Sequence, residues 1–148
     1  MERLLNDMVS QQVKEVFESE LTQPVHLMFF GSQDRCEFCE PTRQLVEELT
    51  PLSDKLSASY YDLTADAELA RTYRVDKSPS ILLTALEGET RRDLGIRYAG
   101  MPSGHEFTSL INSIIMVSQR SGGLSKSTLD FLAGVKEDVH LQVFVTPT

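Results

Sequence analysis

The chain has 148 residues, which suits one domain able to bury roughly 70% of its unfolded surface without a covalent crosslink. Fourteen basic against twenty-two acidic residues give a net charge of −8, which argues against nucleic acid or an anionic membrane as a partner. Residues 1 to 7 lack the basic start and apolar core of a secretory signal, and no stretch approaches ~18 apolar residues. The sequence therefore favours a cytoplasmic protein.

The first part of the chain predicts a helix, a strand and a second helix. Apolar side chains recur at helical spacing over residues 3 to 20, so this segment is expected to be an amphipathic helix packed on a sheet. Residues 25 to 30 are nearly all apolar, which is typical of a central strand covered on both faces. A helix is expected from Cys36 to about Leu49. Pro41 is expected to kink it, because proline removes a backbone hydrogen bond.

The rest of the chain adds further strands and helices. Strands are expected at residues 57 to 63, 80 to 85 and 94 to 98, and helices at residues 65 to 73 and 103 to 118. A turn at residues 86 to 89 joins the last two strands as an antiparallel hairpin. Because the earlier strands alternate with helices, they need a parallel crossover. The fold class is therefore α/β, with a mixed β-sheet flanked by helices on both faces.

The two cysteines of the chain stand three residues apart, at Cys36 and Cys39, where the first strand gives way to a helix. A helix N-terminus has unpaired N–H groups and a favourable dipole, which stabilise a thiolate there. Cys36 is therefore the expected nucleophile. Cys39 lies one turn further on the same helical face, close enough to attack a mixed disulfide, and is the expected resolving thiol.

Two other uses of this pair stay open. A structural zinc site needs four ligands, and the three histidines show no ligand spacing near the cysteines, so such a site would need a second chain. The pair can also be inert or merely structural. In a reducing cytosol, a C-x-x-C motif is more often catalytic or metal-binding than a permanent crosslink. Redox chemistry without a metal is therefore the leading interpretation.

The order of helices and strands, with C-x-x-C opening the helix after the first central strand, resembles the thioredoxin fold with an extra N-terminal helix. A second marker is Pro79 at the start of a predicted strand, where thioredoxin-like proteins carry a cis-proline that faces the dithiol. The resemblance extends to the two-unit, glutaredoxin-like protein disulfide oxidoreductases, and to the N-terminal part of the flavoprotein that reduces alkyl hydroperoxide reductase. It rests on residues 36 to 42, 73 to 80 and 97 to 107.

This resemblance implies a substrate-binding face around the dithiol. In thioredoxin-like proteins the residue before the cis-proline offers its backbone to an extended substrate segment, a role that falls here to Ser78. The same resemblance assigns Pro79, Gly100, Glu37 and Phe38 to this face. Phe38 is expected to give a substrate an apolar contact, or alternatively to cap the core.

The sequence departs from thioredoxin where that family handles the proton of the resolving thiol. Phe30 stands six residues before Cys36, where thioredoxins bury an aspartate, so another base must serve. Asp34, Glu37 and Glu40 are the nearest candidates, although a solvated acid near a helix start is the commoner role of such residues. The chain also contains no tryptophan, so the aromatic side chain usually found beside the dithiol is missing.

These features predict a thiol–disulfide oxidoreductase whose substrates are disulfide-containing proteins. Cys36 would attack the substrate disulfide, Cys39 would resolve it, and a thioredoxin-reductase-like flavoprotein or a thiol reductant would restore the dithiol. The domain itself needs no cofactor beyond its cysteine pair, and FAD and NAD(P)H would belong to a partner or fused reductase. The alternative is a binding or scaffold module of a larger redox flavoprotein whose chemistry is done by another unit.

Three segments are expected along the chain. Residues 1 to 120 form the thioredoxin-like domain, and residues 121 to 138 form a linker with a capped connecting helix. Residues 139 to 144 repeat residues 25 to 30 at four of six positions, a match that chance can also produce because strands use few residue types. Residues 139 to 148 are expected to be the first strand of a truncated second thioredoxin-like unit.

Overall fold

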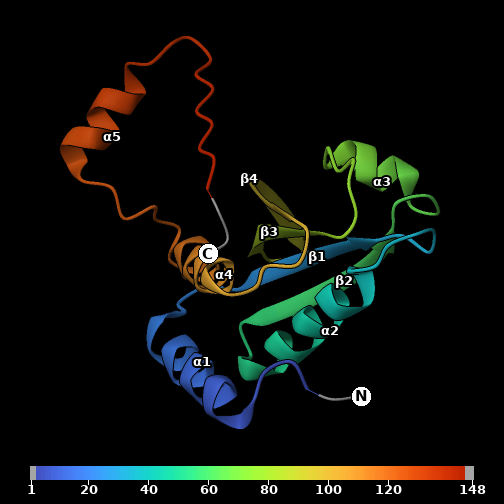
Figure 1. Cartoon of the computed structure of the whole chain (residues 1–148). Helices are drawn as coiled ribbons and strands as arrows, with labels where there is room; N and C mark the ends of the chain where they lie inside the picture. Colours follow the sequence, from blue (N-terminus) through green and yellow to red (C-terminus); the bar gives the residue numbers. More distant parts are fainter. Residues whose placement is uncertain (1–2, 146–148) are drawn as a thin grey trace.

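The computed structural model describes residues 3 to 145 of the chain (Figure 1). In chain order the helices and strands are α1 (Asp7–Glu20), β1 (Val25–Gly31), α2 (Cys39–Leu49), the 3-10 helix η1 (Thr50–Leu52), β2 (Leu56–Asp62), α3 (Ala67–Thr72), β3 (Ser80–Glu87), β4 (Thr90–Ala99), α4 (His105–Gln119) and α5 (Lys126–Ala133). This order agrees with the order that the sequence predicts as far as α5.

The four strands form one mixed sheet in the order β2-β1-β3-β4. β1 pairs with β2 in parallel and with β3 in antiparallel orientation. β3 and β4 form an antiparallel hairpin, whose turn contains Gly88 in the left-handed backbone region (φ +62°). The expected mixed sheet is confirmed, because the crossover through α2 makes β1 and β2 parallel while the tight turn makes β3 and β4 antiparallel.

β1 lies in the middle of the molecule, and every one of its residues is buried. Side chains alternate between the two faces of a strand, so both faces of β1 must be covered. Val25, Leu27 and Phe29 belong to a core cluster that includes side chains of α1, α2 and α4. Met28 and Phe30 belong to a smaller cluster with side chains of α3 and the loop that follows it. Helices therefore lie on both faces of the sheet, as predicted.

α1 begins at Asp7 rather than at residue 3. Its N-cap is Asn6, whose side-chain oxygen accepts a hydrogen bond from the N–H of Val9 at 2.9 Å. The preceding residues are held by α2 instead, because the N–H groups of Leu4 and Leu5 donate to the Glu48 carboxylate at 3.0 and 2.8 Å. A contact between residues so far apart in the chain leaves no trace in a local helical pattern.

The C-terminal segment differs from the rest of the molecule. α5 confirms that a capped helix forms here, and the Ser125 hydroxyl caps it by accepting a hydrogen bond from the N–H of Thr128 at 3.3 Å. The strand expected from residue 139 is not formed, because residues 139 to 145 pair with neither edge of the sheet and remain exposed. The division of the chain into units stays a prediction, and residues 146 to 148 lie outside the described residues.

Candidate functional site

The two cysteines form a disulfide in the connection between β1 and α2. Their Cα atoms are 5.3 Å apart, and both residues are half-buried. Cys36 precedes α2, Phe38 is the N-cap, and Cys39 is the first helical residue. The expected C-x-x-C arrangement therefore places both sulfurs at the start of a helix that packs on the central strand.

One detail of the sequence prediction is wrong at this point, and the reason given for another does not apply. α2 begins at Cys39 rather than at Cys36, because residues 37 and 38 form a turn closed by a hydrogen bond from the Cys39 N–H to the Cys36 carbonyl at 3.4 Å. Pro41 consequently lies in the first turn of α2, where backbone N–H groups have no acceptor within the helix. Its missing N–H removes no helical hydrogen bond, so the physical reason for a kink does not apply.

The Cys39 sulfur is held from the side of the strand. The backbone N–H of Ser32 donates a hydrogen bond to Cys39 Sγ at 3.3 Å. Gly31, the last residue of β1, provides the necessary space, since a Cβ atom there would lie 2.9 Å from the Phe29 ring and 3.6 Å from the same sulfur. Glycine at this position therefore lets β1 end directly beside the disulfide.

The cis-proline that the resemblance implies is present. The peptide bond between Ser78 and Pro79 is cis, and Pro79 is buried directly before β3. The N–H of Gly100 donates to the Pro79 carbonyl at 2.8 Å from a left-handed backbone conformation (φ +99°) that favours glycine. Ser80 pairs with Phe30 near the end of β1. This register puts the cis-proline at the end of the sheet from which the disulfide loop departs.

Glu37 and Phe38, between the two cysteines, are exposed. Phe38 has 52% of its surface exposed, so it does not cap the core, which removes one of the two uses expected for it. An exposed aromatic ring beside a disulfide is available for apolar contact with another molecule. The substrate-binding roles of these two residues, and those of Ser78, Pro79 and Gly100, stay predictions.

A cavity of about 460 Å³ opens beside Cys39. Its wall includes Glu40 and Arg43 from α2, Tyr60, Tyr61 and Asp62 from β2, and Asp66 from the turn before α3. Of the three acids expected as candidate bases, Glu40 lines this cavity, whereas Asp34 and Glu37 do not. Sequence reasoning missed Asp62 and Asp66 because they lie at the end of β2 and in the turn after it, far in sequence from the cysteines. The signal was available, since the carboxyl ends of neighbouring parallel strands meet at one edge of a sheet.

Asp62 is fixed in the cavity wall by backbone hydrogen bonds. Its carboxylate accepts the N–H groups of Ala65, Thr64 and Gln33 at 2.9, 2.8 and 3.2 Å. The bond from Ala65, followed by the bond from Thr64, holds the pKa of Asp62 below its ordinary value, because these donors favour the charged form. The wall therefore contains an ionised carboxylate at neutral pH.

Arg43 is the cation in the cavity wall, and it already has partners. Its Nε donates to the Glu47 carboxylate at 2.8 Å, and its guanidinium carbon lies 5.0 Å from the centre of the Tyr60 ring. The hydrogen bond to Glu47 raises the pKa of Arg43. Its charge is matched mainly by Glu47, one turn further along α2, and to a smaller extent by Glu40 in the cavity wall.

His26 lies in β1, and its ring is held between two serine hydroxyls of β2. Its Nδ1 is 2.7 Å from the Ser57 hydroxyl and its Nε2 is 2.9 Å from the Ser59 hydroxyl, so the ring bridges β1 and β2. Burial, with a smaller effect from the charge of Arg91, lowers the pKa of His26 to about 4. The ring is therefore neutral at physiological pH, with one nitrogen donating and the other accepting.

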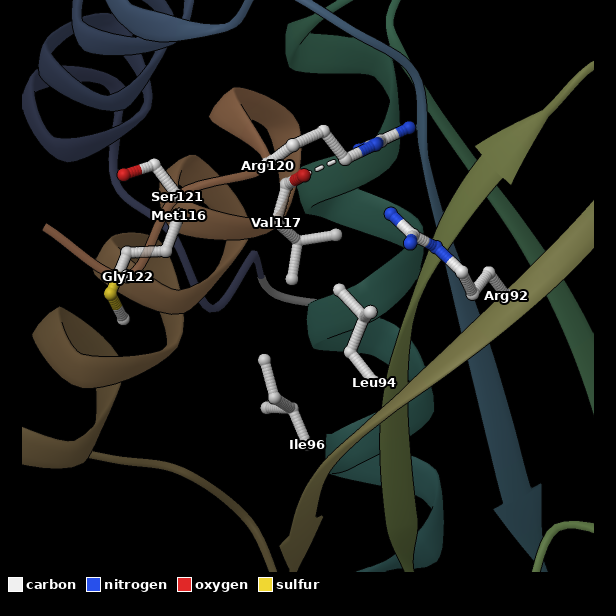
Figure 2. A pocket seen from close by; sticks show the side chains of 8 residues that line it. All are labelled: Arg92, Leu94, Ile96, Met116, Val117, Arg120, Ser121 and Gly122. Carbon is white, nitrogen blue, oxygen red and sulfur yellow. Dashed lines mark hydrogen bonds between the residues drawn. The ribbon is translucent and has the colours of Figure 1, made fainter. Parts of the chain in front are cut away.

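A second hollow, of about 350 Å³, lies between β4 and the C-terminal end of α4 (Figure 2). Leu94, Ile96 and Val117 give it an apolar floor, and Arg92 and Arg120 stand at its border. None of the residues that line it is a cysteine, a histidine or a carboxylate. It therefore lacks groups for covalent or acid–base chemistry, and the disulfide with its cavity remains the candidate site.

Two other kinds of site are absent from the described part of the chain. Among residues 3 to 145, no three side chains of histidine, cysteine, aspartate or glutamate gather closely enough to hold a metal ion. Over the same residues, no helix combines the length and the apolar character needed to cross a membrane.

Solved structures resemble this chain over most of its length. A protein disulfide oxidoreductase from Aeropyrum pernix matches 90% of the chain with a TM-score of 0.75 and 24% identity, and the match covers 57% of that protein. The chain has a thioredoxin-like fold. The NTD_N/C domain of the alkylhydroperoxide reductase AhpF from Enterococcus faecalis matches 85% of the chain with a TM-score of 0.74 and 25% identity, covering 58% of that structure.

Curated relatives extend the comparison to sequence. The AhpF component of alkyl hydroperoxide reductase from Staphylococcus aureus is 29% identical over 145 residues, which are 98% of this chain and 25% of the relative. A Bacillus subtilis NADH dehydrogenase is 33% identical over 104 residues, which are 70% of this chain and 17% of that relative. No family model matches. The chain thus spans a quarter or less of these relatives, and nearly its whole length is similar to part of AhpF.

Proposed function

We propose that this domain catalyses thiol–disulfide exchange through Cys36 and Cys39. The observation that carries the proposal is the disulfide itself, which joins two half-buried sulfurs at the start of α2 on a thioredoxin-like fold. A disulfide that serves only as a crosslink is not needed in a domain with a core of this size. A reversible pair is the better use of two cysteines placed at a surface-accessible helix start.

The proposed reaction begins with the reduced domain. The Cys36 thiolate attacks one sulfur of the substrate disulfide, forming a mixed disulfide and releasing the first substrate thiolate. Cys39 loses its proton and attacks the Cys36 sulfur, which releases the second substrate thiol and forms the Cys36–Cys39 disulfide. The substrate gains two electrons, and the domain loses two. An external thiol or a flavoprotein reductase then returns two electrons to the pair.

The assignment of the two cysteines follows from their surroundings. Cys36 lies before α2 and outside the helical hydrogen bonds, next to the exposed Phe38 ring and at the positive end of the helix dipole. Cys39 is part of the helix, and its sulfur accepts the Ser32 N–H. Cys36 is therefore the sulfur better placed to meet a protein substrate, and Cys39 the one better placed to resolve it.

The proposed substrate face joins the disulfide to the cis-proline. Ser78 would pair its backbone with an extended substrate segment, Pro79 and Gly100 would shape the floor of this face, and Glu37 and Phe38 would border it. Homology supports a flavoprotein as the electron donor, with FAD and NAD(P)H bound outside this domain. Disulfide-containing proteins would be the substrates.

We also propose that the domain ends near residue 120. Residues 126 to 133 and 139 to 145 would then be the first helix and first strand of a second thioredoxin-like unit, in the order of α1 and β1. This arrangement is supported by matches that cover little more than half of the solved structures described above.

Two single substitutions test the proposed reaction in an assay of insulin disulfide reduction with dithiothreitol as the electron source. Cys36→Ser is expected to abolish turnover above the uncatalysed rate. Cys39→Ser is expected to accumulate a mixed disulfide at Cys36, visible by mass spectrometry as the mass of one attached substrate chain. Retention of most activity in Cys36→Ser would show that the mechanism is wrong. An equal, slow alkylation of both thiols in the reduced domain would favour the scaffold alternative.

A further inference from the structure

The cavity beside Cys39 differs from the rest of the substrate face in charge and shape. It is a hollow of about 460 Å³ with Cys39, the partner of Cys36 in the disulfide, in its wall. Phe38, by contrast, offers a substrate only an exposed apolar surface. We therefore expect a matching substrate segment to contact Phe38 with an apolar group and to place another side chain in the cavity.

The charge of the cavity wall selects the kind of side chain. Glu40, Asp62 and Asp66 supply three carboxylates, against the single guanidinium of Arg43. Arg43 is already paired with Glu47 outside the cavity. With three carboxylates against one guanidinium, the cavity has an excess of negative charge next to the disulfide, and it favours a cation over an anion.

The aromatic part of the wall fits the same ligand. Phe29 and Tyr60 line the cavity from the face of the sheet that α2 covers, whereas the Tyr61 ring packs against Phe30 on the other face. The faces of aromatic rings attract ammonium and guanidinium groups. Tyr60 already holds the guanidinium of Arg43 at 5.0 Å from its ring centre, which shows that this wall accepts a planar cation. The carboxylates beside the Cys39 sulfur, together with the Tyr60 ring, suit an arginine or lysine side chain.

We propose that this cavity is a subsite for a cationic side chain of the substrate. In the substrate sequence, this side chain would stand next to a cysteine of the disulfide that is reduced. The inference rests on the proposed thiol–disulfide exchange and names the substrate class: polypeptide disulfides flanked by arginine or lysine. Glutathione disulfide carries a net negative charge, so the same cavity disfavours it. Specificity of this kind acts mainly on the rate of encounter and therefore weakens as ionic strength rises.

The test uses the full chain in its reduced form and two symmetric peptide disulfides. The peptides are identical except for the residue beside the cysteine, which is arginine in one and glutamate in the other. Stopped-flow measurement of a single turnover gives the second-order rate constant for each peptide. The arginine peptide is expected to react ~10-fold faster than the glutamate peptide at low ionic strength, and the ratio is expected to shrink toward one in ~0.5 M salt.

Matched variants locate the effect. Glu40→Gln removes one carboxylate of the cavity from an exposed helical position and is expected to lower the ratio about threefold, whereas Glu40→Lys is expected to bring it to one or below. Glu89→Gln removes the same charge from the distant turn between β3 and β4, and it is expected to leave the ratio unchanged. Circular dichroism of each variant checks that the fold is retained.

The outcomes separate this inference from the function on which it rests. If neither peptide oxidises the dithiol, the proposed exchange reaction fails. If both peptides react at the same rate, the reaction stands and the cationic subsite is wrong. If Glu89→Gln lowers the ratio as much as Glu40→Gln does, the preference comes from the overall charge of −8 and the cavity does not determine it.

Discussion

Two segments of similar sequence, residues 25 to 30 and residues 139 to 144, differ in structure and burial. Four of six positions are identical, yet the first segment is the fully buried strand β1, whereas the second is exposed and unpaired. Leu27 has no exposed surface, while Leu141, at the equivalent position, is 87% exposed. The comparison shows that an apolar segment of high β-propensity forms a strand only where neighbouring strands and helices cover it.

The helices before these segments repeat the contrast. α1 buries Val13 and Phe17 in the main core cluster, and its loop continues directly into β1. α5 buries none of its residues and extends away from the sheet (Figure 1). A helix of this length is marginal in water without tertiary contacts, so its exposed Leu129, Phe131 and Leu132 form an apolar surface available to another unit or chain.

The largest effect is expected from truncating the same aromatic residue in each segment. Phe30→Ala should lower the free energy of unfolding by about 3–5 kcal/mol, because it opens a cavity among Met28, Leu82 and the other residues of the smaller core cluster. Phe144→Ala should change it by less than about 0.5 kcal/mol, because that ring is 85% exposed. Urea unfolding of both variants measures the pair, and similar losses would show that the two segments are equally packed in solution.

A smaller effect is expected from pH at His26. Its pKa in the folded state, about 4, lies below the unfolded value near 6.5, so folding favours the neutral ring. This contribution is complete above pH 6.5 and is lost as the pH falls from about 6.5 to 4, where the unfolded chain binds the proton more readily. The difference amounts to about 2–3 kcal/mol.

The measurement is the free energy of unfolding at several pH values between 4 and 7, for the parent chain and for His26→Gln. The parent should lose more stability than the variant across this window, since glutamine does not titrate. Parallel curves would show that burial beside Ser57 and Ser59 does not shift the titration of His26.

The smallest effect is expected from deleting the exposed C-terminal segment. Deleting residues 139 to 148 should leave both the thermal midpoint and the alkylation rate of the reduced dithiol nearly unchanged, because residues 139 to 145 pair with neither sheet edge. Differential scanning calorimetry and a timed reaction with iodoacetamide provide the two readings. A large drop in the thermal midpoint of the monomer would show that this segment completes the domain's own sheet.

Much of the fold could be predicted from local patterns, and the exceptions share a cause. β1, the hairpin, α4 and the capped α5 follow from apolar periodicity and turn residues that lie within the segment itself. The start of α1 departs from the apolar pattern, because the local N-cap Asn6 begins the helix later and the carboxylate of Glu48 on another helix holds Leu4 and Leu5 outside it. The failed strand at residue 139 has the same explanation, since its pattern was correct but no partner strand lies beside it among the described residues.

The candidate site divides in the same way. Cys36, Cys39 and the cis bond before Pro79 could be predicted from short motifs and from the resemblance to thioredoxin-like proteins. Asp62 and Asp66 could not be found by searching near the cysteines, because they reach the cavity through the parallel pairing of β1 with β2. Their contribution to the site depends on register, which a single sequence defines only after its strands are paired.

The reduction potential of the Cys36–Cys39 pair tests the central claim most directly. Equilibration of the chain in dithiothreitol redox buffers, followed by trapping and counting of free thiols, gives this value. A disulfide that takes part in exchange should have a potential between about −120 and −270 mV, and Cys36→Ser should remove the transition. A potential below roughly −300 mV would instead mark a permanent structural crosslink and contradict a role in thiol–disulfide exchange.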